Sequence, residues 1–378
     1  AFFILGISMG LLFFLPLLPI KKWQEGVIIL FILVSWGSVI YITTHTQNLL
    51  WLPYPNGIIN DTRLWMIQKI DMQIVDKEAS GFAKALLIGV KSDIDSNIIK
   101  AYTQLGIIHI IAISGMHLDI IFKNLVYITG HLPRKFFWRL LELTIVLISV
   151  WIYTFIAFAS PSVVRASIFF SLFFMGTFLN QPKYTLNCIA GGILVILFFD
   201  LHAIYHIGLQ LSYAAVIGIH LFYPVFYKMV PMDNTILNWM WSNLCITLSA
   251  QLTTLPILLF HFHQTSTLVI ISNFIMVPLT TILLYALIVL VMMPNQVSFS
   301  MHLGSLIQSY INLLNRMVIY FHQKPIGTPM LIQMSGQMLV GYYFWLLFLY
   351  IWLYKRKAKY LFYSLVIFTL ISLIKLFP

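Results

Sequence analysis

Long apolar runs recur along this chain, and they constrain its fold more than any other feature. Several have about 18 residues or more, enough for one helix to cross a hydrocarbon layer of about 30 Å. Of the 378 residues, 60% are hydrophobic and only 9% are charged, whereas soluble domains carry about 25% charged residues. We therefore predict an all-α polytopic integral membrane protein with about 10–12 transmembrane helices.

The apolar runs also divide the chain. The predicted spans are 2–19, 26–43, 105–128, 137–158, 163–179, 185–199, 207–227, 239–260, 267–293, 338–354 and 360–377. Residues 1–43 would form N-terminal transmembrane helices, 44–80 an amphiphilic connector and 81–378 the main membrane domain. Helical spacing of apolar and polar residues from Asp61 to Ile74, and again over 301–321, predicts one or two interfacial or core-packing amphipathic helices.

The charge is unevenly distributed. Residues 1–95 carry equal numbers of acidic and basic side chains, so the formal net charge of +11 comes from residues 96–378. Cytoplasmic Lys and Arg loops explain such an excess under the positive-inside rule. A path for a polyanion would add to the same excess, because Lys and Arg neutralise phosphates.

The basic clusters only partly agree on an orientation. If every predicted span crosses once, most of them fall on one side of the membrane, but the Lys355–Lys359 cluster falls on the other. This disagreement indicates that the 301–321 helix also crosses, that the stretch around Gly115 is re-entrant, or that another span is miscounted.

Polar residues interrupt the run at 105–128. They are His109, Ser114, Gly115, His117 and Asp119, and polar groups at membrane depth are costly enough to suggest a function. In an unbroken helix the two histidines would lie on roughly the same side, facing a polar cavity or bonding neighbouring helices. Gly115 permits close approach of a helix or a ligand.

Other apolar spans contain polar residues as well. Arg165 is either an interfacial anchor or an intramembrane cation, paired with Asp200 or Glu142, whose planar fork suits phosphate. Further polar positions are Gln210, Ser212, Gln251, Thr254 and Asn273. Each alone is typical of helix packing, but together they could form a polar path. Cys188 and Cys245 define no metal site, and we expect no cofactor.

These residues fall into five segments that resemble, in order, the signature of the ComEC-type competence proteins. The segments are Gly106/His109/Ala112/Ser114/Gly115/His117, Pro161–Ala166 with Arg165, Asp200 with Gln210–Ala215, Gln251/Thr254/Pro256 and Asn273/Pro278. The resemblance implies a helical channel that passes single-stranded DNA across the bacterial inner membrane during natural transformation. The sequence shows no paired carboxylates and no His/Cys cluster at metal-ligand spacing, so we expect no catalysis by this chain.

The same resemblance implies a DNA path and partners. The candidate path residues are His109, Ser114, Gly115, His117, Arg165, Asp200, Gln210, Ser212, Gln251, Thr254 and Asn273. The implied partners are single-stranded DNA, membrane lipid and a separate DNA receptor, nuclease and cytoplasmic motor. Two departures from the family matter: residues 44–80 are too short for an OB-like domain, and the His-x-His-x-Asp-His nuclease motif is absent from the sequence.

Two alternatives remain. A small-solute or lipid transporter would be expected to show inverted repeats, and none is evident in the sequence. A rhomboid-like intramembrane serine protease would use Ser114 as its nucleophile, with His206 or His220 as the base. Ala112 stands where that protease motif requires glycine.

Overall fold

The computed structural model describes residues 57–133, 135–179, 185–294, 298–324 and 329–376. The predicted spans at 2–19 and 26–43 lie outside these residues. Within the described part nearly every element is a helix, which confirms the all-α polytopic fold. Helices long and apolar enough to cross a membrane are α8 (Phe136–Ile156), α9 (Pro161–Phe178), α11 (Ile207–Tyr227), α12 (Thr235–Phe262), α13 (Val269–Met292) and α15 (Gly336–Lys355). Two further apolar helices are α10 (Thr185–Phe199) and α16 (Ala358–Leu376).

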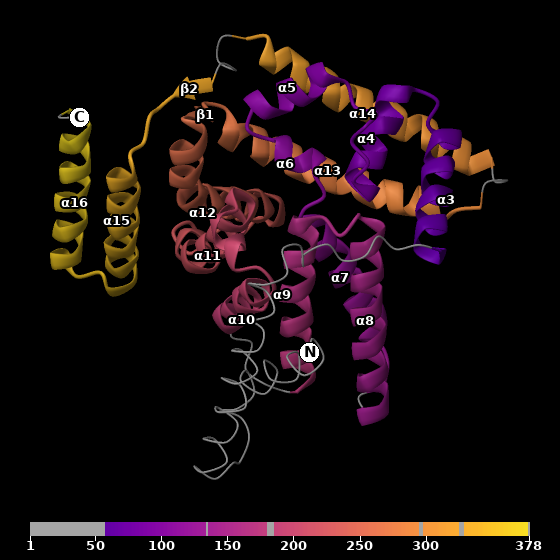
Figure 1. Ribbon diagram of the computed structural model, residues 1–378, viewed down its shortest axis with the longest axis horizontal. Coiled ribbons are helices and arrows are strands. Elements are labelled where there is room, and N and C mark those ends of the chain that lie inside the picture. Colours follow the sequence, from indigo (N-terminus) through magenta and orange to yellow (C-terminus); the bar gives the residue numbers. More distant parts are fainter. Residues whose placement is uncertain (1–56, 134, 180–184, 295–297, 325–328, 377–378) are drawn as a thin grey trace.

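The largest apolar core lies around α13 and α14 (Ser298–His322). Shorter helices surround this pair, namely α3 (Ile58–Gln73), α4 (Lys77–Ile88), α5 (Ser96–Gln104) and α6 (Ile108–Ile111). Figure 1 shows α13 and α14 running side by side across the upper part of the molecule. Buried side chains of this core include Phe82, Leu287 and Ile311. The predicted helix at 301–321 is thus part of α14 and packs into the core.

The polar stripe of α14 is used to hold the neighbouring short helices. Gln308 Oε1 accepts hydrogen bonds from the backbone N–H groups of Val75 and Asp76, each at 3.1 Å. Asn312 donates to the Asp76 carboxylate at 2.8 Å. These bonds fasten the α3–α4 turn to α14.

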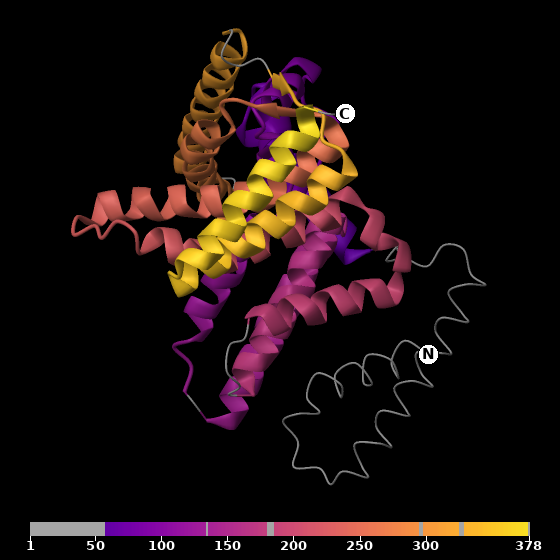
Figure 2. The same cartoon turned by 90° about the vertical axis from the view of Figure 1, so that its left-hand side faces the viewer.

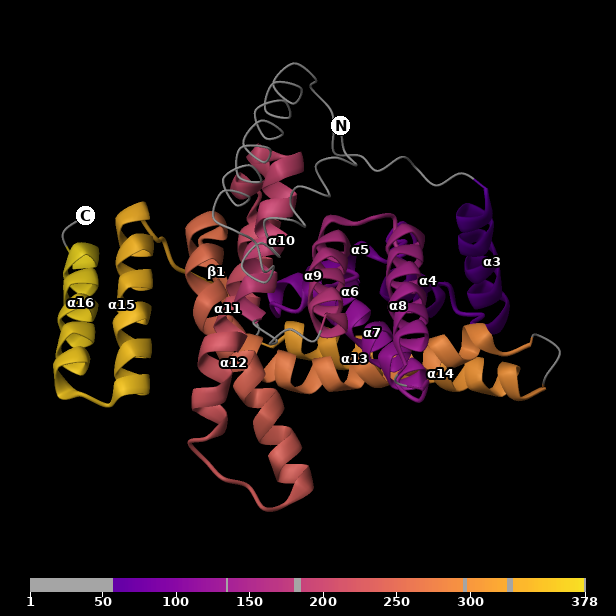
Figure 3. The same ribbon diagram turned by 90° about the horizontal axis from the view of Figure 1, so that it is seen from below.

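A second core joins α7 (Gly115–Thr129), α8 and α9, which extend away from the α13–α14 pair (Figure 1). The α11–α12 pair lies beside it and carries α15 and α16 on its outer side (Figures 2 and 3). A glycine permits the α11–α12 contact, because a Cβ at Gly218 would lie 2.2 Å from Thr253 Oγ1. Phe222, Leu346 and Leu353 bury the contact with α15.

The prediction of one helix over 105–128 is wrong. Helix α6 ends at Ile111 and α7 begins at Gly115, with Ala112 and Ser114 in extended conformation between them. The break is stabilised locally, since the Ser114 backbone N–H donates to His117 Nδ1 at 3.1 Å. That bond satisfies one of the donors that an α-helix leaves free at its start.

A two-stranded antiparallel ladder was not predicted. Strand β1 (Gln264–Ser266) follows α12, and β2 (Pro329–Leu331) precedes α15, with Gln264 opposite Leu331. Ile332 N–H also donates to His263 O at 2.9 Å. The ladder therefore holds the end of α12 beside the start of α15 (Figure 1).

Two buried cations on α3 bind the C-terminal ends of two long helices. Arg63 donates to Ile156 O at 3.0 Å and to Phe155 O at 2.9 Å, at the end of α8. Lys69 donates to Val291 O at 2.7 Å, at the end of α13. Each side chain is only 3% exposed. A cation is favourable at this end of a helix, where carbonyl groups point outward with partial negative charge.

Arg63 also supports the strained turn that links α8 to α9. Phe158 and Ala159 both have positive φ, at 60° and 45°, a conformation that costs about 1–2 kcal/mol for residues other than glycine. The Arg63 guanidinium lies 3.5 Å from the centroid of the Phe158 ring. Residues 57–80, the described part of the connector predicted at 44–80, therefore pack against the main domain, and Arg63 stabilises one of its turns.

Candidate functional site

The starts of α7, α9 and α11 and the end of α12 meet at one place, which we call the junction. At its first contact, Ser162 on α9 donates through Oγ to Ile113 O at 2.8 Å, just before α7 begins. Gly115 lies against Ala166, because a Cβ at position 115 would be 3.4 Å from the Ala166 methyl group. Two predicted path residues, Ser114 and Gly115, are thus beside the start of α9.

The second part of the junction joins α9, α11 and α12. A Cβ at Gly208, on the first turn of α11, would lie 3.8 Å from Arg165 Nη2. Tyr213, further along α11, is close enough to Arg165 to interact with it electrostatically. Gln210 Oε1 is 3.2 Å from His261 Nε2 on α12. Sequence reasoning missed His261, although its position five residues after Pro256 in the fourth family segment was a usable signal.

Four polar atoms in and near this region are buried without a hydrogen-bond partner among the described residues. They are Arg165 Nε, Tyr213 OH, Gln251 Nε2 and Asn273 Oδ1. A buried polar group left dry costs about 1–3 kcal/mol. Water or a polar ligand would remove that cost. Three of these residues were predicted for the path, and Tyr213 belongs to the same Gln-Leu-Ser-Tyr segment.

Unpartnered polar atoms also occur outside the junction. Within the described part of the chain they are Gln73 Oε1, Asn315 Nδ2 and His322 Nδ1, all on α3 or α14. The other polar side-chain atom of each amide has a partner: Gln73 bonds to Ser300, and Asn315 bonds to Tyr102. The junction differs because Arg165 and Tyr213 lie there in family segments from two separate helices, α9 and α11, while Gln251 lies on α12, about 15 Å along that helix from His261.

In the part of the chain that the structure describes, none of the remaining path candidates shares a hydrogen-bond partner with Arg165, and those that have partners bond to residues nearby in the sequence. Asp200 accepts from His202 N–H at 2.9 Å and so caps the short 3₁₀ helix η2 (Leu201–Tyr205). Among the described residues Arg165 forms no ion pair with Asp200 or Glu142; the ion pairs found there are Lys84–Asp71, Lys84–Asp93 and Lys123–Asp119. Thr254 bonds to Ala250 O in its own helix at 2.9 Å. Ser212 is half-buried on α11.

The two histidines of the first segment have different environments. His109 on α6 is exposed, whereas His117 on α7 is 1% exposed. Ser114 Oγ lies 3.0 Å from His117 Nδ1. Because the Ser114 backbone N–H donates to the same nitrogen, Nδ1 is an acceptor and the ring proton is on Nε2. The Ser114–His117 pair closes the first turn of α7. Ser114 therefore contacts His117, and not His206 or His220, one of which the protease alternative requires as the base.

Several basic residues lie away from the junction, where they bind a helix end, pair with a carboxylate or are exposed. Arg139 donates through Nη2 to Phe178 O, the last residue of α9, and stacks on its ring with 5.4 Å between guanidinium and centroid. Lys123 pairs with Asp119 at 2.6 Å. Lys355, Arg356, Lys357 and Lys359 are exposed at the α15–α16 turn. The basic excess is therefore only partly directed toward the junction.

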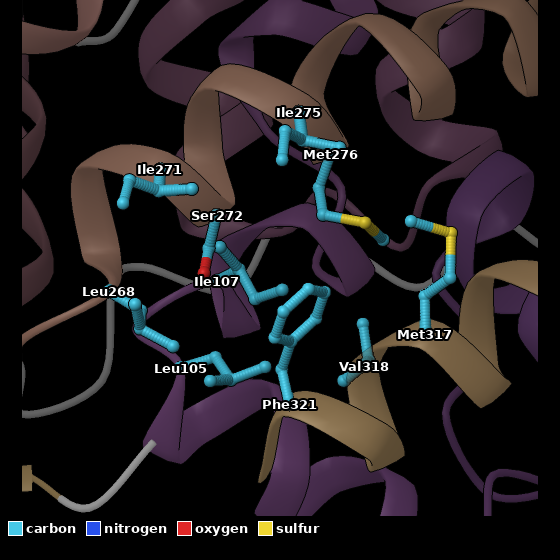
Figure 4. Close-up of a pocket in the computed structure, with 10 residues that line it drawn as sticks. All are labelled: Leu105, Ile107, Leu268, Ile271, Ser272, Ile275, Met276, Met317, Val318 and Phe321. Carbon is cyan, nitrogen blue, oxygen red and sulfur yellow. The ribbon is translucent and has the colours of Figure 1, made fainter. Parts of the chain in front are cut away.

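Two cavities lie near these elements, and they differ in size and chemistry. The larger, of about 560 Å³, opens beside the junction. It is lined by Gly89, Val90, Lys91, Ser92, Ala112, Ile113, Ala157, Phe158, Ser160, Pro161 and Ser162. The smaller holds about 40 Å³ between α13, α14 and the α5–α6 turn, and Figure 4 shows that its lining is apolar apart from Ser272. It is too small for a nucleotide, so of these two cavities the larger is the one that could admit a polar ligand.

Comparison with known proteins identifies the family. The profile described as "Competence protein" matches residues 86–356. ComE operon protein 3 of Bacillus subtilis (strain 168) is 28% identical over 260 residues, which are 68% of this chain and 32% of that protein. An uncharacterized protein of Aquifex aeolicus (strain VF5) is 26% identical over 184 residues, 48% of this chain and 41% of that protein.

The chain therefore spans well under half the length of either relative. No solved structure matches it significantly. The profile covers more than half of the chain and includes every helix end of the junction. This chain belongs to the competence protein family.

Proposed function

We propose that this chain is a channel module through which single-stranded DNA crosses the bacterial inner membrane during natural transformation, and that the strand passes at the junction. Membership of the competence family supports a role in DNA uptake. The observation that carries the proposal is the set of buried polar atoms without partners on Arg165, Tyr213 and Gln251. A hydrated, polar polymer would satisfy atoms that a dry helix bundle leaves unpaired.

The residues of the junction suit a polyanion. Arg165 is permanently charged and offers a planar donor fork that matches phosphate. Gly208 leaves space beside the guanidinium, and the aromatic ring of Tyr213 is nearby. A base can stack on such a ring whatever its sequence. The passage of DNA should therefore not depend on its base sequence, and it should weaken as the salt concentration rises.

The larger cavity provides a route to the junction from solvent. Lys91 on its rim is exposed, and Ser160 and Ser162 lie at the start of α9. Helix starts attract anions because their N–H groups point outward. In this proposal the chain itself performs no catalysis and needs no cofactor. The DNA receptor, the nuclease and the cytoplasmic motor act as separate partners.

Uptake of labelled DNA by cells that carry variants of the full-length protein tests this function. Arg165→Ala should reduce uptake about tenfold or more, since a charge-assisted contact contributes about 1.5–3 kcal/mol. Arg165→Lys should restore it in part, because a point charge lacks the fork. Arg316→Ala removes an exposed arginine of α14 and serves as the control. Normal uptake by an Arg165→Ala protein present at normal level in the membrane would contradict the proposal.

The serine protease alternative retains one specific observation, the contact of Ser114 Oγ with His117 Nδ1. Purified protein incubated with membrane peptides distinguishes the two functions. We expect no cleavage, because the contact closes the first turn of α7. Peptide cleavage that disappears in Ser114→Ala, while the variant keeps its fold, would favour the protease and overturn the channel.

A further inference from the structure

Helix α13 begins and ends near the same side of the molecule. Its N-terminal end follows β1, which the ladder holds beside the start of α15. The preceding helix, α12, ends at the junction through His261. Gly106, in the turn between α5 and α6, lies against both Ser266 and Val269. The start of α13 is therefore fixed at the junction side by contacts from two separate parts of the chain.

The far end of α13 is fixed by the same short helix that binds the end of α8. Lys69 binds Val291 O, and Arg63 binds Ile156 O. These two cations are about 9 Å apart along α3. The end of α8 is on the junction side, because α9 starts only five residues later and contributes Ser162 to the junction. Both ends of α13 thus lie at the side where α8 ends.

The direction of α13 agrees with its ends. Figures 1 and 3 show α13 and α14 running across the direction of α8 and α9. Yet α13 has the highest mean hydropathy of the candidate spans and contains no charged residue. Ile282, Val289 and Met292 lie at helical spacing on its exposed face, and the Tyr285 hydroxyl group between them accepts a hydrogen bond from Asn124 of α7. Such a stripe on a helix without charges is more suited to hydrocarbon than to water or to a polar partner.

We propose that α13 does not cross the bilayer, but lies along its outer leaflet with this stripe in contact with lipid acyl chains. Helix α14 then returns on the same side, and its exposed Ser305, Ser309 and Arg316 suit the headgroup region. The proposal is independent of the DNA path. It concerns where the α13–α14 pair sits and which surface it contacts.

This placement also reconciles the basic clusters. The sequence predicts a span at 185–199, which is the short apolar helix α10. With α10 counted as a crossing, the crossings between the start of α8 and the end of α15 are α8, α9, α10, α11, α12 and α15, an even number. The Lys355–Lys359 cluster then falls on the same side as Lys135 and Arg139, and Lys228 joins them. The positive-inside rule assigns that side to the cytoplasm and the junction to the outside. If α13 crossed the bilayer and α14 did not, the Lys355–Lys359 cluster would lie on the opposite side from Lys135, Arg139 and Lys228.

Single-cysteine labelling tests the position of both ends. Cys188 and Cys245 are first replaced by alanine, and one cysteine is introduced at Gln264, Pro294 or Lys357. A membrane-impermeant maleimide should label Gln264→Cys and Pro294→Cys in intact spheroplasts, and Lys357→Cys only after permeabilisation. Labelling of Gln264→Cys with protection of Pro294→Cys until permeabilisation would show that α13 crosses. Phe299→Cys, at the start of α14, repeats the measurement should Pro294→Cys prevent membrane insertion.

Lipid contact is tested by a nitroxide label at Val289→Cys, with Ser309→Cys on α14 as the matched exposed control. In vesicles of phosphatidylethanolamine and phosphatidylglycerol, the label at position 289 should collide more often with oxygen than with a water-soluble nickel chelate. The label at 309 should show the reverse preference. A nickel-accessible label at 289, or one protected from both reagents, would overturn lipid contact in favour of water or a protein partner.

Discussion

Gln210 and His261 join α11 to α12 through a hydrogen bond of 3.2 Å between Oε1 and Nε2. Gln210 Nε2 also donates to Ile204 O at 3.0 Å, so its carbonyl oxygen is the atom that faces the histidine. The His261 proton is therefore on Nε2. This bond links the start of α11 to the end of α12 at the junction and so holds these two helix ends together.

Removing either partner of this bond should lower DNA uptake. We expect Gln210→Leu and His261→Leu each to lower uptake, and the double variant to be little worse than Gln210→Leu, because the bond between the two residues, worth about 0.5–1.5 kcal/mol, is lost only once. Gln210→Leu also removes the bond to Ile204 O and should have the larger effect of the two single variants. His302→Leu, which changes an exposed histidine of α14, is the control. Strictly additive losses in a double-mutant cycle would mean that the two residues act separately.

The α11–α12 contact should not tolerate a larger residue at Gly218. Its Cβ would lie 2.2 Å from Thr253 Oγ1 and 2.5 Å from Ser249 O, so Gly218→Ala should destabilise the protein by about 1–3 kcal/mol. Gly176→Ala on α9 meets no heavy atom within 4 Å and should be neutral or slightly stabilising. Thermal unfolding in detergent compares the two. Equal midpoints would show that α11 and α12 are further apart than described.

The cations of α3 should stabilise the helix ends that they bind. Arg63→Met and Lys69→Met each leave buried carbonyl groups without their charged donors, and we expect a loss of about 1.5–3 kcal/mol for each. Lys100→Met, an exposed change on α5, is the matched control. The thermal midpoint reports the loss. A midpoint unchanged from the parent protein in Arg63→Met would exclude a stabilising cap at the end of α8.

Acid should weaken the Lys84–Asp93 pair, which lies outside the candidate spans. The hydrogen bond from Lys84, and then that from Ser92, lowers the pKa of Asp93 below 3.8. A carboxylate with a lowered pKa contributes stability above its unfolded pKa and loses it as the pH falls through the folded value. The thermal midpoint of the parent protein should therefore fall below about pH 4 more steeply than that of Asp93→Asn. If the thermal midpoints of the two proteins change equally with pH, the Lys84–Asp93 pair does not contribute to acid-sensitive stability.

The same pair has a counterpart at high pH. Burial alone would lower the pKa of Lys84, but hydrogen bonds to Asp93 and Asp71 outweigh it and raise the pKa above 10.5. The stability that Lys84 contributes is therefore present below that value and is lost as the pH rises through the folded pKa. We expect Lys84→Met to be less stable than the parent at neutral pH, and the difference to shrink in strong base. A difference that does not depend on pH would indicate loss of packing alone.

The sequence by itself determined the class of the fold and most of the residues at the junction. Apolar runs of sufficient length require helices in a bilayer, because no water is present there to bond free backbone groups. Arg165, Gln210 and Gln251 stood out for the same reason, as polar groups in apolar segments. Amphipathic spacing likewise identified α14, since a helix that packs on one face shows that face in its sequence. The spacing did not show which face α3 buries, because Arg63, Lys69 and Gln73 are buried there while Leu64 is exposed.

Tertiary structure decided the features that depend on distant partners. The break before Gly115 is a local event, but its position beside Ala166 and Ser162 comes from packing of α7 on α9. The carbonyl groups at Ile156 and Val291 are bound by cations more than ninety residues earlier in the sequence. Hydropathy records how much apolar surface a segment has and not which way the segment runs. The β1–β2 ladder and the Gly106 turn hold the start of α13, and Lys69 holds its end, and no periodicity in the chain records those contacts.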